Sequence, residues 1–187
     1  VQTCALPIYH KFPRDTIDFV LRDCSARLVF CDRERRAMVP GDVPVADFDD
    51  DGPQGYAALL DPGPFEAVRP EVGEAAMVLY TSGSTGRPKG VPLSHSAHLW
   101  AVNARLNGAN LDRHRLLVAA PLFHMNGLGT SKFSIAAHAS MVLLPQFDTR
   151  HYIEAIGRFG VTWLTSVPTM MAMVAREREL LSGTDLS

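Results

Sequence analysis

The sequence predicts an α/β protein in which layered sheets are flanked by helices. Apolar runs of about five residues alternate with helical patterns of roughly ten to fifteen residues over much of the chain, which is typical of this fold class. The 187 residues carry 47% hydrophobic and 20% charged side chains, as an ordinary globular domain does. Because strands that alternate with helices form crossovers, we expect mainly parallel pairing.

The amino-terminal part of the chain predicts one helix and one strand, followed by turns. Apolar residues at three- and four-residue spacing favour a helix over 14–26, with Pro13 before it. Residues 27–31 are expected to form a short buried strand. Six prolines punctuate residues 39–73, so long helices and strands are not expected there.

From residue 75 onward the pattern becomes a regular alternation of strands and helices. The expected strands cover residues 76–80, 91–93, 116–120, 141–144 and 161–165. The expected helices cover residues 94–107, 128–138, 149–159 and 168–181. Their start signals are Ser94 and either Asp148 or Thr149 as N-caps, and Pro168 in a first helical turn.

Composition and charge exclude several classes of protein. The net charge of -2 leaves no basic surface for nucleic acid or anionic lipid. The longest apolar runs fall far short of the roughly 20 residues that a membrane helix needs, so no transmembrane segment is expected. Three cysteines do not form a disulfide scaffold, and a reducing, cytoplasmic location is the simplest expectation. Nothing in the sequence predicts an oligomeric state.

The first eight residues, 1–8, are predicted to be foreign to the protein. They show no periodic pattern and lack the charged start and apolar core of a signal peptide. One reading frame of a common sequencing adapter encodes the same residues. We therefore expect the native sequence to begin near residue 9 or His10, and the chain to be part of a longer reading frame.

The stretch from Tyr80 to Gly90 predicts a loop that binds polyphosphate, with ATP as the first candidate. Its glycines let backbone amides turn toward an anion, and Lys89 adds a mobile positive charge. A Walker loop is excluded because Gly90, and not Ser or Thr, follows Lys89. The dinucleotide-binding pattern is excluded because Gly83 and Gly86 are three residues apart.

This loop resembles the signature phosphate loop of the adenylate-forming, AMP-binding superfamily. That superfamily contains acyl-CoA and aryl-CoA synthetases, luciferases and peptide-synthetase adenylation domains. Three further stretches are similar to the family: Val91–His95 after the loop, the motif Pro121–Gly127, and the strand-to-helix turn Trp163–Thr169. The resemblance covers nearly all of residues 10–187. It implies that residues 9–187 form a partial N-terminal domain, with the C-terminal domain absent.

The resemblance implies an acid–thiol ligase of the acyl-CoA synthetase type. Such an enzyme uses ATP and Mg²⁺ to convert a small-molecule carboxylic acid to acyl-AMP, and then transfers the acyl group to CoA. The Pro-Leu-Phe-His motif favours a fatty or other simple acid. An aminoacyl or aryl adenylation domain that loads a carrier protein stays open as an alternative, as does a non-catalytic nucleotide-binding remnant.

The resemblance also assigns roles to individual residues. The ATP phosphates are assigned to Thr81, Ser82, Gly83, Ser84, Thr85, Gly86 and Lys89. The carboxylate and acyl pocket is assigned to His124, Met125, Asn126, Gly127, Val167 and Pro168. His124 and Lys89 are the catalytic candidates, although a structural role at a loop-to-helix junction is the alternative for His124.

Two kinds of site are not expected in these 187 residues. His95 and His98 have no acidic or cysteine partner at ligand spacing, so no metal ligands are predicted. The family's later residues for adenine, ribose and the catalytic lysine of the C-terminal domain cannot be placed. The isolated polypeptide is therefore expected to lack synthetase activity.

Overall fold

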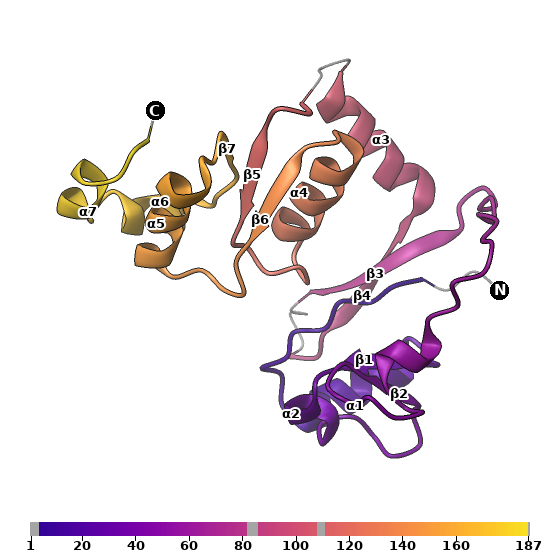
Figure 1. Ribbon diagram of the computed structural model, residues 1–187. Helices are drawn as coiled ribbons and strands as arrows, with labels where there is room; N and C mark the ends of the chain where they lie inside the picture. Colours follow the sequence, from indigo (N-terminus) through magenta and orange to yellow (C-terminus); the bar gives the residue numbers. More distant parts are fainter. Residues whose placement is uncertain (1–3, 82–85, 108–110, 187) are drawn as a thin grey trace. The chain divides into compact units, whose positions relative to one another are not determined.

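The computed structural model describes residues 4–81, 86–107 and 111–186, and Figure 1 shows the order of their helices and strands. These residues form two compact units, of which the first ends at His95 and the second begins at Ser96. Sheets with flanking helices confirm the predicted α/β class. Among the described residues, no helix has the length and apolar character needed to cross a bilayer.

The first unit contains two separate sheets. Its elements are α1 (Arg14–Asp23), β1 (Val29–Cys31), α2 (Arg33–Arg36), β2 (Val45–Asp47), the 3-10 helix η1 (Tyr56–Leu59), β3 (Ala75–Thr81) and β4 (Lys89–Ser94). Strands β1 and β2 pair in parallel, and the buried residues Ile17 and Leu21 of α1 pack with Val39 beside them. The proline-punctuated region holds only short elements, as predicted. Helix α2 was not predicted, and its N-cap Asp32 accepts a hydrogen bond from the amide of Arg35.

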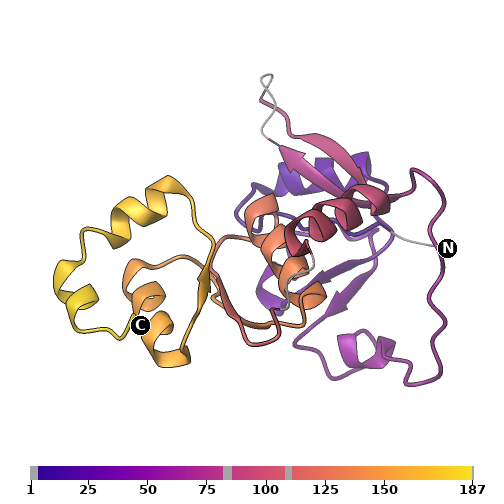
Figure 2. The ribbon, with the colours of Figure 1, turned by 90° about the horizontal axis from the view of Figure 1, so that it is seen from above.

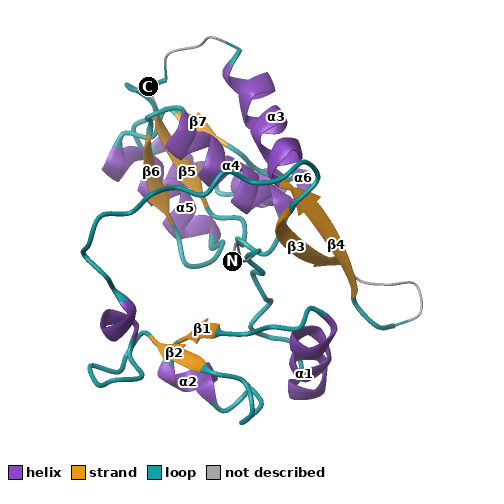
Figure 3. Cartoon of the chain, turned by 90° about the vertical axis from the view of Figure 1, so that its right-hand side faces the viewer, coloured by secondary structure: helices purple, strands orange, loops and turns teal. Residues whose placement is uncertain are grey.

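Strands β3 and β4 form an antiparallel hairpin, which Figure 3 shows as two adjacent arrows. This pairing departs from the mainly parallel expectation, because the predicted phosphate loop is short enough to connect neighbouring antiparallel strands. Ala5 also pairs with β3, because its amide donates to the Ala76 carbonyl at 3.0 Å and its carbonyl accepts from the Val78 amide at 3.1 Å. Almost any residue can form such backbone hydrogen bonds, so this pairing does not test whether residues 1–8 are native. The adapter origin of residues 1–8 therefore stays a prediction.

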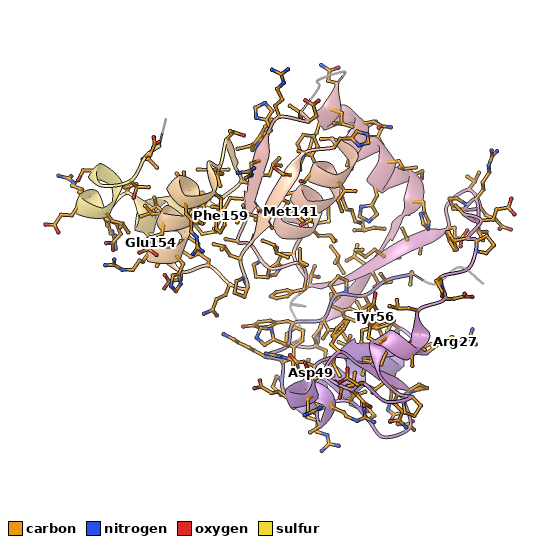
Figure 4. All side chains as sticks on the ribbon, viewed as in Figure 1. Arg27, Asp49, Tyr56, Met141, Glu154 and Phe159 are labelled. Carbon is orange, nitrogen blue, oxygen red and sulfur yellow. The ribbon has the colours of Figure 1, made fainter. Side chains whose placement is uncertain are left out.

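The second unit is a parallel sheet with helices on both faces. Helix α3 spans His95–Leu106 and begins at the boundary between the two units. The elements that follow it are β5 (Arg115–Val118), α4 (Met125–Ala136), β6 (Ser140–Leu143), α5 (Thr149–Phe159), β7 (Trp163–Leu164), α6 (Pro168–Val174) and α7 (Arg178–Ser182). The strand order is β6–β5–β7, and both pairings of β5 are parallel. Figure 4 labels Met141 on β6 and Phe159 at the end of α5.

The central strand β5 separates two apolar clusters. Leu116 and Leu117 are fully buried and point to opposite faces of the sheet, since successive residues of a strand alternate. Leu116 packs with Phe133 of α4, whereas Leu117 packs with Tyr152 of α5 and Met170 of α6. Helix α4 therefore covers one face, and α5 and α6 cover the other.

Two predicted helix starts in this unit are confirmed, but α4 begins at Met125 and not at residue 128, because the Leu128 amide already donates to the carbonyl of the N-cap His124 at 3.0 Å. Asp148 caps α5 by accepting from the amide of His151, and Pro168 is the first residue of α6. The single helix predicted over 168–181 is wrong, because α6 ends at Val174 and α7 begins at Arg178. The break allows α7 to fold back toward α5, so that two leucines pack on the core; these are Leu180 and Leu181. Figure 2 shows α5, α6 and α7 gathered together in orange and yellow.

Candidate functional site

The first set of candidate residues lies at the end of the β3–β4 hairpin. Thr81 is the last residue of β3 and Lys89 the first of β4, and the two are register partners. Directly opposed residues of an antiparallel pair project to the same face, so the hydroxyl and the ammonium share one side of the hairpin. Both residues are exposed. They can therefore offer a hydrogen-bond donor and a positive charge to one anion.

Two glycines at this hairpin are required for different reasons. Gly86 has a φ of 83°, a left-handed conformation that glycine adopts without the steric cost of a β-carbon. A β-carbon at Gly90 would lie only 3.0 Å from Cζ of Tyr80, its register partner. The Tyr80 ring therefore crosses the hairpin over Gly90, on the face opposite to the Thr81 and Lys89 side chains.

Part of the predicted phosphate loop can be located and part cannot. Thr81, Gly86 and Lys89 are described, and they flank the turn as the sequence predicts. The other predicted phosphate-binding residues lie outside the described residues, and their roles stay predictions; they are Ser82, Gly83, Ser84 and Thr85.

The second set of candidate residues lies beyond the carboxyl ends of two neighbouring parallel strands. The motif Pro121–Gly127 follows β5, and the turn at Val167–Pro168 follows β7. The chain leaves β5 toward α4 on one face of the sheet and leaves β7 toward α6 on the other. Adjacent strands whose connections depart to opposite faces mark the switch point at which open α/β sheets bind ligands.

A hydrogen bond joins the two motifs at this point. Thr130 on α4 is 2% exposed, and its Oγ1 lies 3.1 Å from Oγ1 of Thr165, two residues before Val167. Thr130 also donates to the Asn126 carbonyl at 2.7 Å. Sequence reasoning missed Thr130, although its spacing of three residues from Gly127 places both on one face of a helix and could have revealed it.

His124 stands at the amino terminus of α4. It is the N-cap residue, with φ of -113°, and its side chain makes no capping hydrogen bond. Its side chain is exposed. The first turn of a helix presents unpaired amides and a partial positive charge, which favour a bound anion. The imidazole and the helix terminus can therefore act on the same carboxylate.

Gly127 has a packing role that the sequence did not predict. A β-carbon there would lie 2.2 Å from the Ala120 carbonyl oxygen and 2.6 Å from that of Pro121. Glycine is therefore needed here because α4 packs closely against the backbone that follows β5. The assignment of Gly127 to the carboxylate and acyl pocket stays a prediction.

The remaining pocket candidates differ in their surroundings. Met125 is 45% exposed and Val167 is 40% exposed, so both could contact a ligand. Pro168 is exposed and starts α6. Asn126 carries a buried Oδ1 without a hydrogen-bond partner among the described residues, and its role in the pocket stays a prediction.

The candidates fall into two groups, each described within its own unit. Thr81, Gly86 and Lys89 belong to the first unit, and the residues from His124 to Pro168 belong to the second. The first group is suited to a polyphosphate and the second to a carboxylate beside an apolar group.

Comparison with known proteins identifies the family of the chain. A sequence model of the family described as AMP-binding enzyme matches residues 2–187. The chain is 32% identical over 171 residues to a 2-succinylbenzoate–CoA ligase of Bacillus velezensis, covering 86% of this chain and 32% of that protein. It is 35% identical over 175 residues to an indoleacetate–CoA ligase of Aromatoleum aromaticum, covering 85% of this chain and 34% of that protein.

Solved structures share the fold. The o-succinylbenzoate CoA synthetase of Bacillus subtilis, in complex with ATP and magnesium ion, superposes with a TM-score of 0.73 at 26% identity. This match covers 93% of the present chain and 36% of the synthetase. The chain thus spans about a third of the length of the relatives it matches.

Proposed function

This chain belongs to the AMP-binding enzyme family, and from that premise we propose that it serves an ATP-dependent acid–thiol ligase. In the proposed reaction its hairpin binds the ATP phosphates and its second unit binds the carboxylic acid. The observation that carries the proposal is the pairing of Thr81 with Lys89 across a glycine-rich turn. The relatives named as CoA ligases support it.

The first proposed step joins the acid to the nucleotide. A carboxylate oxygen attacks the α-phosphorus of ATP, and the bond from that phosphorus to the oxygen bridging to the β-phosphate breaks. The products are acyl-AMP and pyrophosphate. Both reactants are anions, so the protein must mainly neutralise charge and align them. Lys89 and the Thr81 hydroxyl hold the departing pyrophosphate, while His124 and the first turn of α4 hold the acid.

The second proposed step transfers the acyl group to a thiol. The thiol sulfur of CoA attacks the acyl carbonyl, the bond to the AMP oxygen breaks, and AMP leaves with that oxygen. None of the residues assigned above contacts CoA in this proposal. The 187-residue polypeptide by itself is therefore predicted to bind nucleotide without forming acyl-CoA.

Magnesium enters the proposal with its nucleotide. Mg²⁺ prefers carboxylate and phosphate oxygens in octahedral geometry, and at the described end of the hairpin Thr81 offers a hydroxyl and no carboxylate. These residues do not form a magnesium site by themselves. We therefore treat MgATP as the substrate, with the ion bound to the phosphates.

The identity of the acid is a finer part of the proposal. A fatty or other simple acid is the prediction from the sequence motif, whereas the named relatives carry 2-succinylbenzoate and indoleacetate in their names. Pyrophosphate release measured with a panel of fatty acids, 2-succinylbenzoate and indoleacetate decides which class of acid is used. The free cysteines of the predicted native sequence, Cys24 and Cys31, support a reducing cytosol as the compartment.

Ligand binding by the chain is the first experiment. Isothermal titration of the 187-residue polypeptide with pyrophosphate and with MgATP should detect binding of both. The same sample, given ATP, acid and CoA, should form no acyl-CoA. Absence of binding to either phosphate ligand would contradict the assignment of the hairpin.

Sequencing of the source DNA on both sides of codons 1–187 gives the second experiment. We expect an adapter junction near codon 9 and an open frame that continues past codon 187. The product of that frame should release pyrophosphate with one acid of the panel and then consume CoA. Use of a carrier-protein thiol in place of CoA would support the adenylation-domain alternative, and binding without pyrophosphate release would support the non-catalytic remnant.

A further inference from the structure

One face of helix α1 contacts both flanks of the phosphate-binding turn. Phe19 and Asp23 are four residues apart, so they lie on the same face of the helix. Asp23 contacts Tyr80, the residue before Thr81, and Phe19 contacts Arg87, two residues before Lys89. A helix more than fifty positions earlier in the chain thus reaches both sides of the turn.

The contact with Tyr80 is a charge-assisted hydrogen bond. The Tyr80 hydroxyl donates to Oδ2 of Asp23 at 2.5 Å, a short distance of the kind seen when a carboxylate accepts from a hydroxyl. Burial, together with this acceptor, raises the pKa of Tyr80 well above its usual value. The Tyr80 ring also lies over Gly90, so one side chain spans the hairpin and ends on α1.

The contact with Arg87 is a cation–π interaction. The guanidinium carbon lies 5.3 Å from the centroid of the Phe19 ring, within the range of about 6 Å for this interaction. Arg87 itself is exposed, whereas Phe19 is half-buried on the helix. The pair therefore ties the second flank of the turn to the same helix.

Helix α1 is a firm support for these contacts. Its opposite side carries Ile17, Val20 and Leu21, of which Val20 is 1% exposed. Ile17 and Leu21 pack in the apolar cluster around Val39. Movement of α1 would therefore disturb a buried core, which is close-packed and resists small displacements.

Helix α1 contacts the face of the hairpin opposite to the Thr81 and Lys89 side chains. Tyr80 and Gly90 are register partners, as are Thr81 and Lys89, and successive pairs point to opposite faces. The Asp23 contact therefore leaves the face of Thr81 and Lys89 open. It can set their spacing without competing for the ligand.

We propose that Asp23 and Phe19 are positioning residues for polyphosphate binding, which hold Tyr80 and Arg87 and thereby set the separation of Thr81 and Lys89. This inference rests on the proposed function of the hairpin. Neither residue touches the phosphates. Both act through the strand ends that do.

The test is a double-mutant cycle with pyrophosphate as the probe. In the full 187-residue chain, Asp23→Ala should weaken pyrophosphate binding about tenfold, since one charged hydrogen bond is lost. Asp23→Asn keeps an oxygen acceptor and should restore most of the affinity. Tyr80→Phe should weaken binding as Asp23→Ala does, and the double variant should be no weaker than either single one. Phe19→Leu should cost about threefold.

The matched control is Asp18→Ala on the same helix. Asp18 pairs with Arg22 at 3.0 Å and is partly exposed, and it should leave pyrophosphate binding unchanged. Amide exchange measured by NMR serves as the second readout. Faster exchange confined to the amides of residues 86, 87, 89 and 90 in Asp23→Ala supports positioning, whereas faster exchange throughout the first unit would mean that the residue only stabilises the fold.

The outcomes separate this inference from the proposed function. A wild-type chain that binds no pyrophosphate would overturn the proposed function, and the positioning role with it. Wild-type binding with unchanged affinity in Asp23→Ala, or additive losses in the double variant, would overturn the positioning role alone.

Discussion

Oγ1 of Thr130 lies 3.1 Å from Oγ1 of Thr165, and this hydrogen bond links two motifs that are far apart in the sequence. Thr130 is on α4, which begins within the Pro121–Gly127 motif, and Thr165 precedes the Val167–Pro168 turn. Because α4 and α6 cover opposite faces of the sheet, this contact fixes the two sides of the candidate acid site against each other.

Loss of the Thr130 hydroxyl should destabilise the second unit. Thr130→Val keeps the shape of the side chain but removes both hydrogen bonds, so we expect a loss of about 2 kcal/mol in the free energy of unfolding. Thr165→Val leaves the bond to the Asn126 carbonyl intact and should cost about 1 kcal/mol. Urea denaturation measures both, and Thr169→Val at an exposed position should change little.

Two glycines of α4 should respond in opposite directions to alanine. Gly127→Ala places a β-carbon 2.2 Å from the Ala120 carbonyl oxygen and should cost about 3 kcal/mol or more. Gly129→Ala meets only the ends of two flexible side chains, each at 3.8 Å, and should stabilise the helix by about 0.5–1 kcal/mol. Thermal denaturation of the pair tests this, and equal effects would contradict the described packing of α4.

Removal of one buried hydroxyl should stabilise the protein. Tyr152 is fully buried, and its hydroxyl has no hydrogen-bond partner among the described residues. A buried unpaired hydroxyl costs about 1–3 kcal/mol, so Tyr152→Phe should raise the free energy of unfolding by about 1 kcal/mol. Tyr80→Phe is the contrasting variant, because that hydroxyl is bonded to Asp23, and it should be destabilising. A destabilised Tyr152→Phe would point to a hydrogen-bond partner for this hydroxyl.

Lys89 should contribute directly to phosphate binding. Lys89→Ala removes the positive charge opposite Thr81 and should weaken pyrophosphate binding about tenfold in low salt, with a smaller loss in high salt because the charge is screened. Isothermal titration at two ionic strengths measures the effect. Lys11→Ala, an exposed lysine of the same unit, serves as the control. Equal affinities for the two variants would remove Lys89 from the proposed site.

Thiol reactivity should depend on pH in a defined direction. Burial raises the pKa of the Cys24 and Cys31 thiols, so little thiolate forms near pH 8. The exposed Cys4 should therefore be alkylated by iodoacetamide first. Because the folded state holds these protons more tightly than the unfolded state, the stability from both thiols is complete below the ordinary thiol pKa and is lost as pH rises above it. Mass spectrometry of the alkylated peptides at pH 7, 8 and 9 follows the order, and equal rates at the three cysteines would contradict it.

Local features of this protein could be predicted from its sequence. Asp148 and Pro168 marked helix starts correctly, because capping and the fixed φ of proline are properties of a few neighbouring residues. The glycines, hydroxyls and lysine between Tyr80 and Gly90 predicted a phosphate loop and, through its resemblance, the AMP-binding family, which the family model confirms. Helix caps and phosphate-loop motifs can be predicted because each depends on a few neighbouring residues.

Features that depend on distant partners were decided only by the tertiary structure. The strand order β6–β5–β7 and the break between α6 and α7 follow from which apolar surfaces meet. Tyr80 and Asp23 are 57 residues apart, and Thr130 and Thr165 are 35 apart. No local pattern selects such partners, because packing and burial choose among many polar residues only when the whole unit has folded.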